Sequence, residues 1–304
     1  MPNSIELAKH YARVFDEVYE AASLTGDLTI PPAFFTEGVN AGEVKIAKEV
    51  LVGLGKYSKT SGYPAGDATL TWETHSYSYD RGRKFSIDKA DNMESALMAM
   101  SGLASRFISK YVVPEVDAVR FSILGTGAGH DAYGILDSSA ETVAAVDTAV
   151  AALGDDGVPL EDLIMYLTFT QYNLLKRSDE AGRFTLPGQD PDARFGRWDG
   201  IKVIPVPSNR FYGEVSLNDG SSSSAGGYTN AGGAINFIIM DKGAAFAHAK
   251  LDEIRLWSPN GENGLPVNPD ANAWRMDYRL YHDLFIPDNA ADGIYVHGNT
   301  DIVS

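Results

Sequence analysis

The chain has 304 residues, of which 44% are hydrophobic and 22% are charged, a composition typical of a globular protein with a sizeable core. It has no cysteine, which excludes disulfide bonds and thiolate chemistry. Its 25 Lys and Arg against 41 Asp and Glu give a formal net charge of −16, which argues against a protein that reads nucleic acid.

Membrane and secretion signals are not found in the sequence. No apolar run approaches the ~18 residues that a membrane-spanning helix needs. Met1–Glu6 lacks the basic and then apolar opening of a signal peptide. We therefore expect production inside the cell and no membrane partner.

The first elements in the chain are expected to be a helix and then an irregular connector. Residues 4–22 have apolar side chains at helical spacing, namely Ile5, Ala8, Tyr11, Ala12, Phe15, Val18 and Tyr19. The segment from Asp27 to Gly42 contains Pro and Gly, which favour turns over regular elements.

Two β-rich segments around a polar, glycine-rich tip predict a long hairpin. The outgoing arm is Val44–Val52, and the return arm is Thr69–Tyr79, which is dense in β-branched and aromatic residues. The tip, Gly53–Asp67, is polar enough to project clear of any core. Because a bare two-stranded ribbon is marginal in water, we expect a neighbouring copy of the protein to receive it.

A long amphipathic helix is predicted directly after the hairpin. Asp91 and Glu94 are spaced as an N-cap and its reciprocal partner. Pro114 is expected to interrupt the helix or to start a second segment that runs to Phe121. A helix of about 20 residues spans roughly 30 Å, so it could be the backbone of a thin subunit. The apolar stripe consists of Met93, Leu97, Met100, Ala104, Phe107 and Tyr111.

The second half of the chain alternates helix, strands and loops. Ser138 and Glu141 form a capping box ahead of an amphipathic helix that Gly154 is expected to end. Strands are predicted at 164–169, at 203–206, at 235–240 as a buried central strand, and at 274–286 with one mainly apolar face. Long loops are predicted at 178–200 and 218–233.

A search for chemistry finds no motif that carries an activity. The histidines are scattered, without the helical pair of a zinc site, at His10, His75, His130, His248, His282 and His297. His282 lies on the apolar face of its strand, which favours a core histidine over a ligand. The glycines Gly125, Gly127 and Gly129 depart from a nucleotide-binding loop in spacing and follow a helix, so a flexible helix exit is the better interpretation.

Acidic pairs offer no stronger signal. Asp155 with Asp156, and Asp288 with Asp292, could hold a hard cation but lack the dense ligand spacing of a calcium loop, so solvated turns are favoured. We therefore assign no catalytic, cofactor-binding or metal-binding residue, expect no cofactor, and expect that the protein is not an enzyme.

Several strings, taken in order and spacing, resemble the major capsid proteins of tailed bacteriophages and prophages, whose fold encapsulins share. The resemblance covers nearly the whole chain, although each string carries shape rather than chemistry. The strings are Tyr57–Tyr63, Gly66–Thr74, Tyr79–Asp88, Val113–Phe121, Ile204–Tyr212, Lys250–Leu256 and Tyr278–Ile286.

The resemblance implies an α+β phage major-capsid fold. Its parts would be an N-terminal arm, an extended hairpin lying on the adjacent subunit, a spine helix with a peripheral sheet, and an axial α/β domain. The expected boundaries are 1–42 for the arm, 43–88 for the hairpin, 89–139 for the spine helix and first part of the peripheral domain, 140–269 for the axial domain, and 270–304 for the second part of the peripheral domain.

The function implied is self-assembly into the icosahedral head shell of a tailed phage or prophage. The protein would form hexamers and pentamers with itself, reside in the virion after synthesis in the bacterial cytoplasm, and enclose double-stranded DNA without sequence-specific binding. An acidic lining would keep packed DNA from adhering, although on charge alone an acidic surface that serves only solubility is the favoured interpretation. Because only about 40 residues precede the hairpin, a separate scaffolding protein is implied, together with a portal.

Alternatives remain open at this point. An encapsulin-type nanocompartment would share the fold and enclose protein cargo, whereas an unrelated α+β enzyme would need a concave site with perturbed ionisable groups. Lys56 and Lys59 at the hairpin tip are placed as the lysines that some relatives crosslink to asparagine, but no motif identifies the asparagine or the acid. Ordinary ion pairs across an interface are the favoured role for these lysines.

Overall fold

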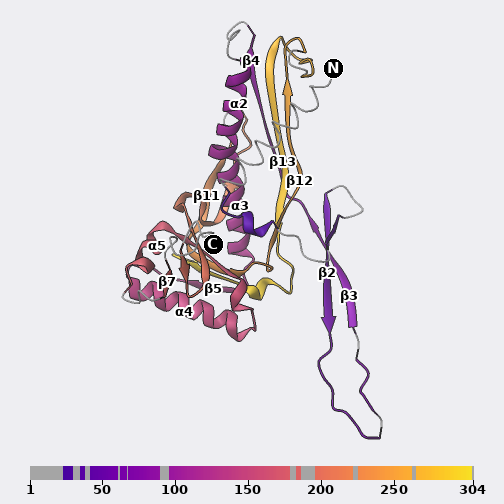
Figure 1. Cartoon of the computed structure of the whole chain (residues 1–304), viewed down its shortest axis with the longest axis vertical. Coiled ribbons are helices and arrows are strands. Elements are labelled where there is room, and N and C mark those ends of the chain that lie inside the picture. The colour runs from indigo at the N-terminus through magenta and orange to yellow at the C-terminus, as the bar shows by residue number, and fades with distance from the viewer. Residues whose placement is uncertain are drawn as a thin grey trace.

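The computed structural model describes residues 23–29, 35–37, 42–60, 62–66, 68–89, 96–178, 183–185, 196–221, 225–261 and 265–302. The helix predicted at 4–22 and the cap predicted at Asp91 and Glu94 lie outside these residues. The chain is elongated, with a helix and a narrow sheet at one end, a larger sheet with its helices at the other, and a hairpin that projects away from both (Figure 1). None of the described helices is long and apolar enough to cross a membrane.

Four α-helices and fourteen strands are found among the described residues. The helices are α2 (Ala96–Phe107), α3 (Val113–Thr126), α4 (Ser139–Asp155) and α5 (Phe169–Lys176). The strands are β1 (Phe35–Glu37), β2 (Glu43–Leu51), β3 (Ala68–Ser76), β4 (Tyr79–Asp88), β5 (His130–Tyr133), β6 (Leu163–Thr168), β7 (Phe184–Thr185), β8 (Arg197–Trp198), β9 (Ile201–Val206), β10 (Tyr212–Leu217), β11 (Tyr228–Asp241), β12 (Phe246–Trp257), β13 (Ala273–Phe285) and β14 (Ile294–Gly298).

A mixed sheet of eight strands forms the larger body. Its order is β5-β14-β11-β6-β9-β8-β7, with β10 paired to β11, so β11 is the buried central strand that the apolar run predicted. Side chains alternate between two cores, as a pleated strand requires. Ile238 and Met240 pack with α3 on one face, whereas Phe237 and Ile239 pack with α4 on the other.

A second sheet, β12-β13-β4, lies along the long helix. The predicted apolar face of β13 is confirmed, because its alternate residues from Trp274 to Leu284 are buried. Trp274 and Met276 pack against Ala104 and Ile108, and Tyr278 packs against Val112. This one-layer sheet with one covering helix makes the thin part of the molecule.

The long helix differs from the prediction at one turn. A π-helical turn, Ile108–Val112, joins α2 to α3, and it holds one residue more than an α-turn. The buried face therefore rotates, so Ile108 and Val112 are buried while Tyr111, expected on the apolar stripe, is 55% exposed. Pro114 does not interrupt the helix, because it lies in the first turn of α3, as the alternative of a second segment allowed.

The hairpin differs from the prediction at its ends. The return strand β3 ends at Ser76 instead of Tyr79, and Tyr79 begins β4, which pairs with β13 and not with β2. The connector predicted before Gly42 contains the short strand β1, which pairs with β2. Strands β4 and β12 both pair with β13 in one sheet. Strand β4 lies within the segment 43–88 that was expected to be the hairpin, and β12 lies within the segment 140–269 that was expected to be the axial domain.

Other boundaries also shift. The capping box of α4 is confirmed, since Glu141 N–H donates to Ser138 Oγ at 3.3 Å and Ser138 N–H donates to Glu141 Oε2 at 3.1 Å. The predicted stop at Gly154 is wrong, because α4 runs to Asp155 and Gly157 takes the left-handed conformation after it. The loop predicted at 218–233 is shorter, since β11 begins at Tyr228.

Candidate assembly interface

The hairpin base is anchored on its own subunit. Val44, Ile46 and Tyr77 are buried against Phe246 and Phe285, and these five residues form one apolar cluster. Full burial of an apolar side chain stabilises a fold by about 1.5–3 kcal/mol, so this cluster holds the base of the hairpin firmly in place.

Ion pairs continue the anchor outward from this cluster. Lys48 Nζ lies 3.1 Å from Glu73 Oε1 on the facing strand and 3.3 Å from Asp288 Oδ2 beyond β13. These ion pairs hold strands β2 and β3 near the C-terminal end of β13. The base of the hairpin is therefore part of the subunit.

Beyond the base, the hairpin has an apolar surface with nothing to cover it in the described chain. The exposed apolar and aromatic side chains are Val52, Leu54, Tyr57, Tyr63, Leu70 and Trp72. Scattered exposed apolar residues are normal, but a row of them along one projecting ribbon marks an interaction surface. Figure 1 shows this ribbon reaching well past the larger body of the subunit.

The tip has a compact turn of its own. Ser58 and Gly62 exchange two backbone hydrogen bonds, at 3.0 and 2.8 Å. The rings of Tyr57 and Tyr63 lie 5.0 Å apart, although Tyr63 is 87% exposed. Lys56, which directly precedes Tyr57, is exposed. The tip therefore contains a hydrogen-bonded turn with a pair of packed tyrosine rings.

The lysines singled out in the sequence, Lys56 and Lys59, are both exposed at this tip. Nothing in a single subunit tests whether either is crosslinked, so that role stays a prediction. Both lie where an ion pair with another copy is sterically open, which is the role we favoured.

The histidines are placed apart from one another. His75 lies 3.5 Å from Glu73, His130 Nε2 lies 2.5 Å from Asp156 Oδ2, and His248 Nδ1 lies 2.5 Å from the Tyr77 hydroxyl. His297 Nδ1 lies 3.2 Å from Asn236. Within the part of the chain that the structure describes, no three His, Asp or Glu side chains are grouped to hold a metal ion.

His282 is placed in the core, as its strand position predicted. It is 2% exposed, and its ring stacks on Tyr79 with centroids 5.8 Å apart. Burial lowers the pKa of His282 to about 3, with a further lowering from Arg120 and Arg81 nearby. The imidazole is therefore neutral at physiological pH.

The glycines after the helix serve close packing. A Cβ on Gly127 would lie 2.6 Å from Ile286 Cδ1, and one on Gly129 would lie 2.8 Å from the backbone of Ala291. Gly125 lies within α3, and a Cβ added to it would lie 3.2 Å from Ile235 Cδ1. These contacts support a packed helix exit over a phosphate-binding loop.

The acidic pairs are used in contacts at the surface. Asp156 lies against His130, and Asp288 lies against Lys48, as given above. The side chain of Asp292 lies close to Gly129. Three of the four acids, Asp156, Asp288 and Asp292, therefore have a neighbour on another element.

A buried carboxylate that the sequence search passed over connects three segments. Asp117 on α3 is fully buried, and its Oδ1 accepts from Thr25 Oγ1 at 2.8 Å. Its Oδ2 accepts from Leu24 N–H at 3.3 Å and from Arg210 Nη1 at 3.2 Å. Burial raises the pKa of Asp117, and this effect outweighs the lowering of the pKa by the hydrogen bond from Thr25 and by the charges of Arg120 and Arg210. The signal was a charged residue on the apolar side of a helix.

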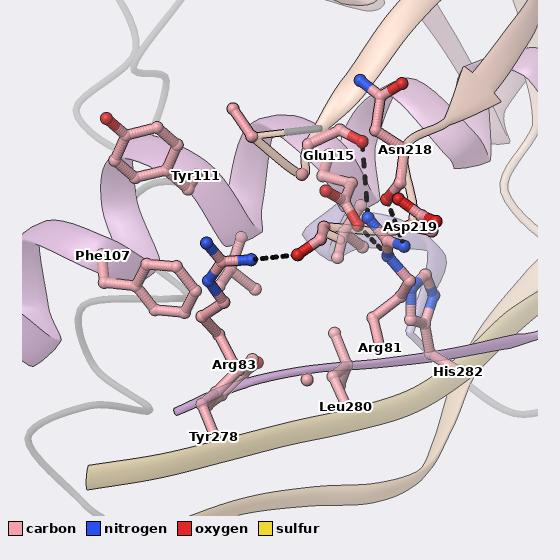
Figure 2. Close-up of a pocket in the computed structure, with 17 residues that line it drawn as sticks. Arg81, Arg83, Phe107, Tyr111, Glu115, Asn218, Asp219, Tyr278, Leu280 and His282 are labelled. Atoms are coloured by element: carbon pink, nitrogen blue, oxygen red, sulfur yellow. Dashed lines mark hydrogen bonds and ion pairs between the residues drawn. The ribbon is translucent and has the colours of Figure 1, made fainter. Parts of the chain in front are cut away.

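Arg81 on β4 connects the narrow sheet, the helix and the larger body (Figure 2). Its Nε donates to Glu115 Oε1 at 2.6 Å, and its Nη1 donates to the carbonyl oxygen of Asn218 at 2.8 Å. Arg83 reaches the same loop, donating to the carbonyl oxygen of Gly220 at 3.4 Å. These side chains border a cavity of about 180 Å³ between β4, β13, the long helix and the β10–β11 loop.

Comparisons with known proteins find likeness in structure and not in sequence. No protein-family model and no curated protein matches the chain. The chain is similar to one in the capsid structure of Cyanophage P-SCSP1u, at 11% identity and a TM-score of 0.58, over 87% of this chain and 85% of that one.

Two further solved structures show the same likeness. The chain is similar to one in the asymmetric unit of the bacteriophage PhiM1 mature capsid, at 9% identity and a TM-score of 0.58, over 85% of this chain and 82% of that one. It is also similar to a virus-like particle from Pyrococcus furiosus, at 9% identity and a TM-score of 0.55, over 96% and 99%. The predicted α+β capsid fold is confirmed.

Proposed function

We propose that this chain is the major capsid protein of a tailed phage or prophage, which self-assembles into an icosahedral shell around double-stranded DNA. The observation that carries the proposal is the capsid fold combined with a hairpin whose exposed apolar row lies clear of its own subunit. A shell protein needs such a surface, because every copy must contact several others.

The parts of the subunit would divide this work. The hairpin would lie on the adjacent subunit, and the long helix would brace the narrow sheet, in which β4 and β12 are included. The larger sheet with α4 and α5 would be the axial domain. Hexamers and pentamers, a separate scaffolding protein and a portal remain implications of the fold, as does residence in the virion.

The role proposed is mechanical and not enzymatic. Support comes from the ionisable groups, because deeply buried ones such as Asp117 and His282 lie in the packing between elements. Asp117 connects backbone and side chains of its own subunit. Groups placed in this way hold a subunit together, which is what a shell requires.

A protein nanocompartment is the second candidate. The likeness to the virus-like particle from Pyrococcus furiosus, which extends over 99% of that chain, favours it as a rival. The two proposals share the fold and the assembly and differ in contents. Extraction of purified particles for DNA and for protein cargo separates them.

Size-exclusion chromatography with light scattering tests the proposal. The expected result is hexamers, pentamers or larger species at micromolar concentration. Monomers at every salt and protein concentration, with scaffolding protein also supplied, would contradict it.

A further inference from the structure

The long helix is shared by two parts of the subunit whose apolar cores are separate. Val112 and Val116 pack against the narrow sheet, whereas Phe121 and Leu124, further along the helix, pack in the core of the larger body. At the end of β13, Leu284 also joins the larger core. The narrow sheet and the larger body therefore meet at one end of the sheet, where a rotation about the helix would change the angle between them.

A loop of the larger body is held by two arginines of the narrow sheet (Figure 2). This loop joins β10 to β11. Arg81 on β4 donates to both ends of the loop, from Nη1 to the carbonyl oxygen of Asn218 at 2.8 Å and from Nη2 to that of Gly227 at 3.4 Å. Arg83 Nη1 donates to the carbonyl oxygen of Gly220 at 3.4 Å. Two charged side chains of one part thus bind three backbone oxygens of the other.

The glycines of the loop make this contact possible. Gly220 has a φ of 71° and Gly226 a φ of 78°, in the left-handed region that favours glycine. A Cβ on Gly220 would lie 2.7 Å from Arg83 Nη1, and one on Gly226 would lie 3.5 Å from the same atom. The loop is therefore suited to the close approach of an arginine, which a larger side chain at position 220 would prevent.

Hydrogen bonds rather than apolar packing hold the loop in place. None of its described residues, 218–221 and 225–227, belongs to an apolar core cluster. The cavity of about 180 Å³ lies between the loop, the long helix and the narrow sheet. Arg81 is itself fixed by the helix, because its Nε donates to Glu115 Oε1 at 2.6 Å. Hydrogen bonds from a charged donor are stronger than neutral ones, so the loop with Arg81 and Arg83 forms a strap between the two parts.

The strap is attached at a distance from the junction of the two parts. Arg83 pairs with Tyr278 on β13, six residues before Leu284, which lies in the larger core. At about 3.3 Å per residue, the two attachments are roughly 20 Å apart along the strand. Two attachments at this spacing resist a rotation that the junction alone would allow.

We propose that the strap fixes the angle between the narrow sheet and the larger body, and that this angle sets the curvature of the assembled shell. The first part concerns the single subunit, and the second rests on the self-assembly proposed above. In a shell of identical subunits, the angle within each subunit contributes to the angle between neighbours. A subunit without the strap would adopt several angles, and its particles would differ in diameter.

The distance between two spin labels measures the angle in the isolated subunit. The chain has no cysteine, so Ser86→Cys on β4 and Thr148→Cys on α4, both exposed positions, place one label on each part. This labelled protein should give one narrow distance distribution. Arg81→Ala should broaden it. Gly220→Ala should also broaden it, because the added Cβ displaces Arg83 while both arginines are retained.

Arg279→Ala is the matched control. Arg279 lies on β13 of the same sheet, and its ion pair with Asp80, at 2.6 Å, is exposed. Its loss removes an arginine without a contact to the loop, so the distance distribution should stay narrow. A broadening equal to that of Arg81→Ala would show a general loosening of the sheet and would overturn the strap. An unchanged distribution in both Arg81→Ala and Gly220→Ala would overturn it as well.

Electron microscopy of assembled particles tests the claim for curvature. Arg81→Ala and Gly220→Ala should give particles of several diameters, whereas the wild type and Arg279→Ala should give one. Broadened label distances with particles of a single diameter would overturn the claim for curvature. If the wild type forms no particles under any condition, the proposed function and the claim for curvature fail together, whereas the label distances still support or overturn the strap.

Discussion

Single residues with buried charge or a buried ring hold the elements of this subunit together. Asp117 links α3 to the segment that contains Leu24 and Thr25 and to Arg210 before β10. His282 on β13 stacks against Tyr79 on β4. Both groups are far from solvent, so their replacement or titration should change stability measurably.

Replacement of Asp117 should cause a large loss of stability. Asp117→Ala leaves Arg210 without its acid and Thr25 without its acceptor, so we expect the free energy of unfolding to fall by about 3 kcal/mol. Urea denaturation of the isolated subunit measures it. Asp219→Ala, which removes an exposed acid, is the control and should change the value by less than about 0.5 kcal/mol. Equal effects of the two substitutions would contradict the role of Asp117.

His282 predicts a pH dependence. Its pKa in the folded subunit, about 3, lies below the ordinary histidine value of 6.5, so its stabilising contribution is complete above pH 6.5 and is lost as the pH falls toward 3. Between pH 7 and pH 5 the wild type should lose about 2 kcal/mol more than His282→Gln. Denaturation curves at both pH values provide the comparison, and parallel losses would contradict a neutral buried ring.

At the scale of elements, the N-cap of α4 is defined by a pair of hydrogen bonds. Ser138→Ala removes the acceptor of the Glu141 N–H, and we expect a loss of about 1 kcal/mol in the free energy of unfolding. Ser138→Asp keeps an acceptor at the cap and is the matched variant, which should retain most of the stability. Thermal unfolding of the wild type, Ser138→Ala and Ser138→Asp measures the effect. If Ser138→Asp lost as much stability as Ser138→Ala, the capping hydrogen bond would not be the cause.

The elements that the sequence predicted best are those with local signals. Periodicity and capping defined α4, and alternation defined β13, because each depends on residues close in the chain. The π-helical turn at Ile108–Val112 was missed, since the apolar spacing through Phe107 and Tyr111 fits a regular α-helix equally well. The strand pairing of Tyr79 was also missed. The sequence placed it at the end of the hairpin's return arm, but it begins β4, and only the non-local pairing of β4 with β13 shows this.

The site was less predictable than the fold. The projecting hairpin follows from its polar tip and its arms, so its presence could be predicted. The junction of Arg81 with Glu115 could not, because these residues are 34 apart and carry no motif. Asp117 could have been noticed as an acid on a buried helix face, but its partners come from segments distant in the chain.

At the scale of the whole molecule, the net charge of −16 predicts behaviour toward DNA. DNA binding depends mainly on phosphate neutralisation and counterion release, so the assembled protein should show no measurable affinity for duplex DNA at physiological salt. Fluorescence anisotropy of a labelled duplex measures it. Tight binding that weakens steeply with added salt would refute the account of an acidic lining.

The most direct test of the account replaces the hairpin tip, Gly53–Asp67, with a short Asn-Gly turn. Both strands, the base cluster around Val44 and the long helix are retained, so the subunit should keep its circular dichroism and melt cooperatively. Electron microscopy of the variant beside the wild type is the deciding measurement. The account predicts shells from the wild type and none from the variant. Normal shells from the variant would contradict a hairpin that joins copies, and global unfolding would contradict a tip that stands clear of its own core.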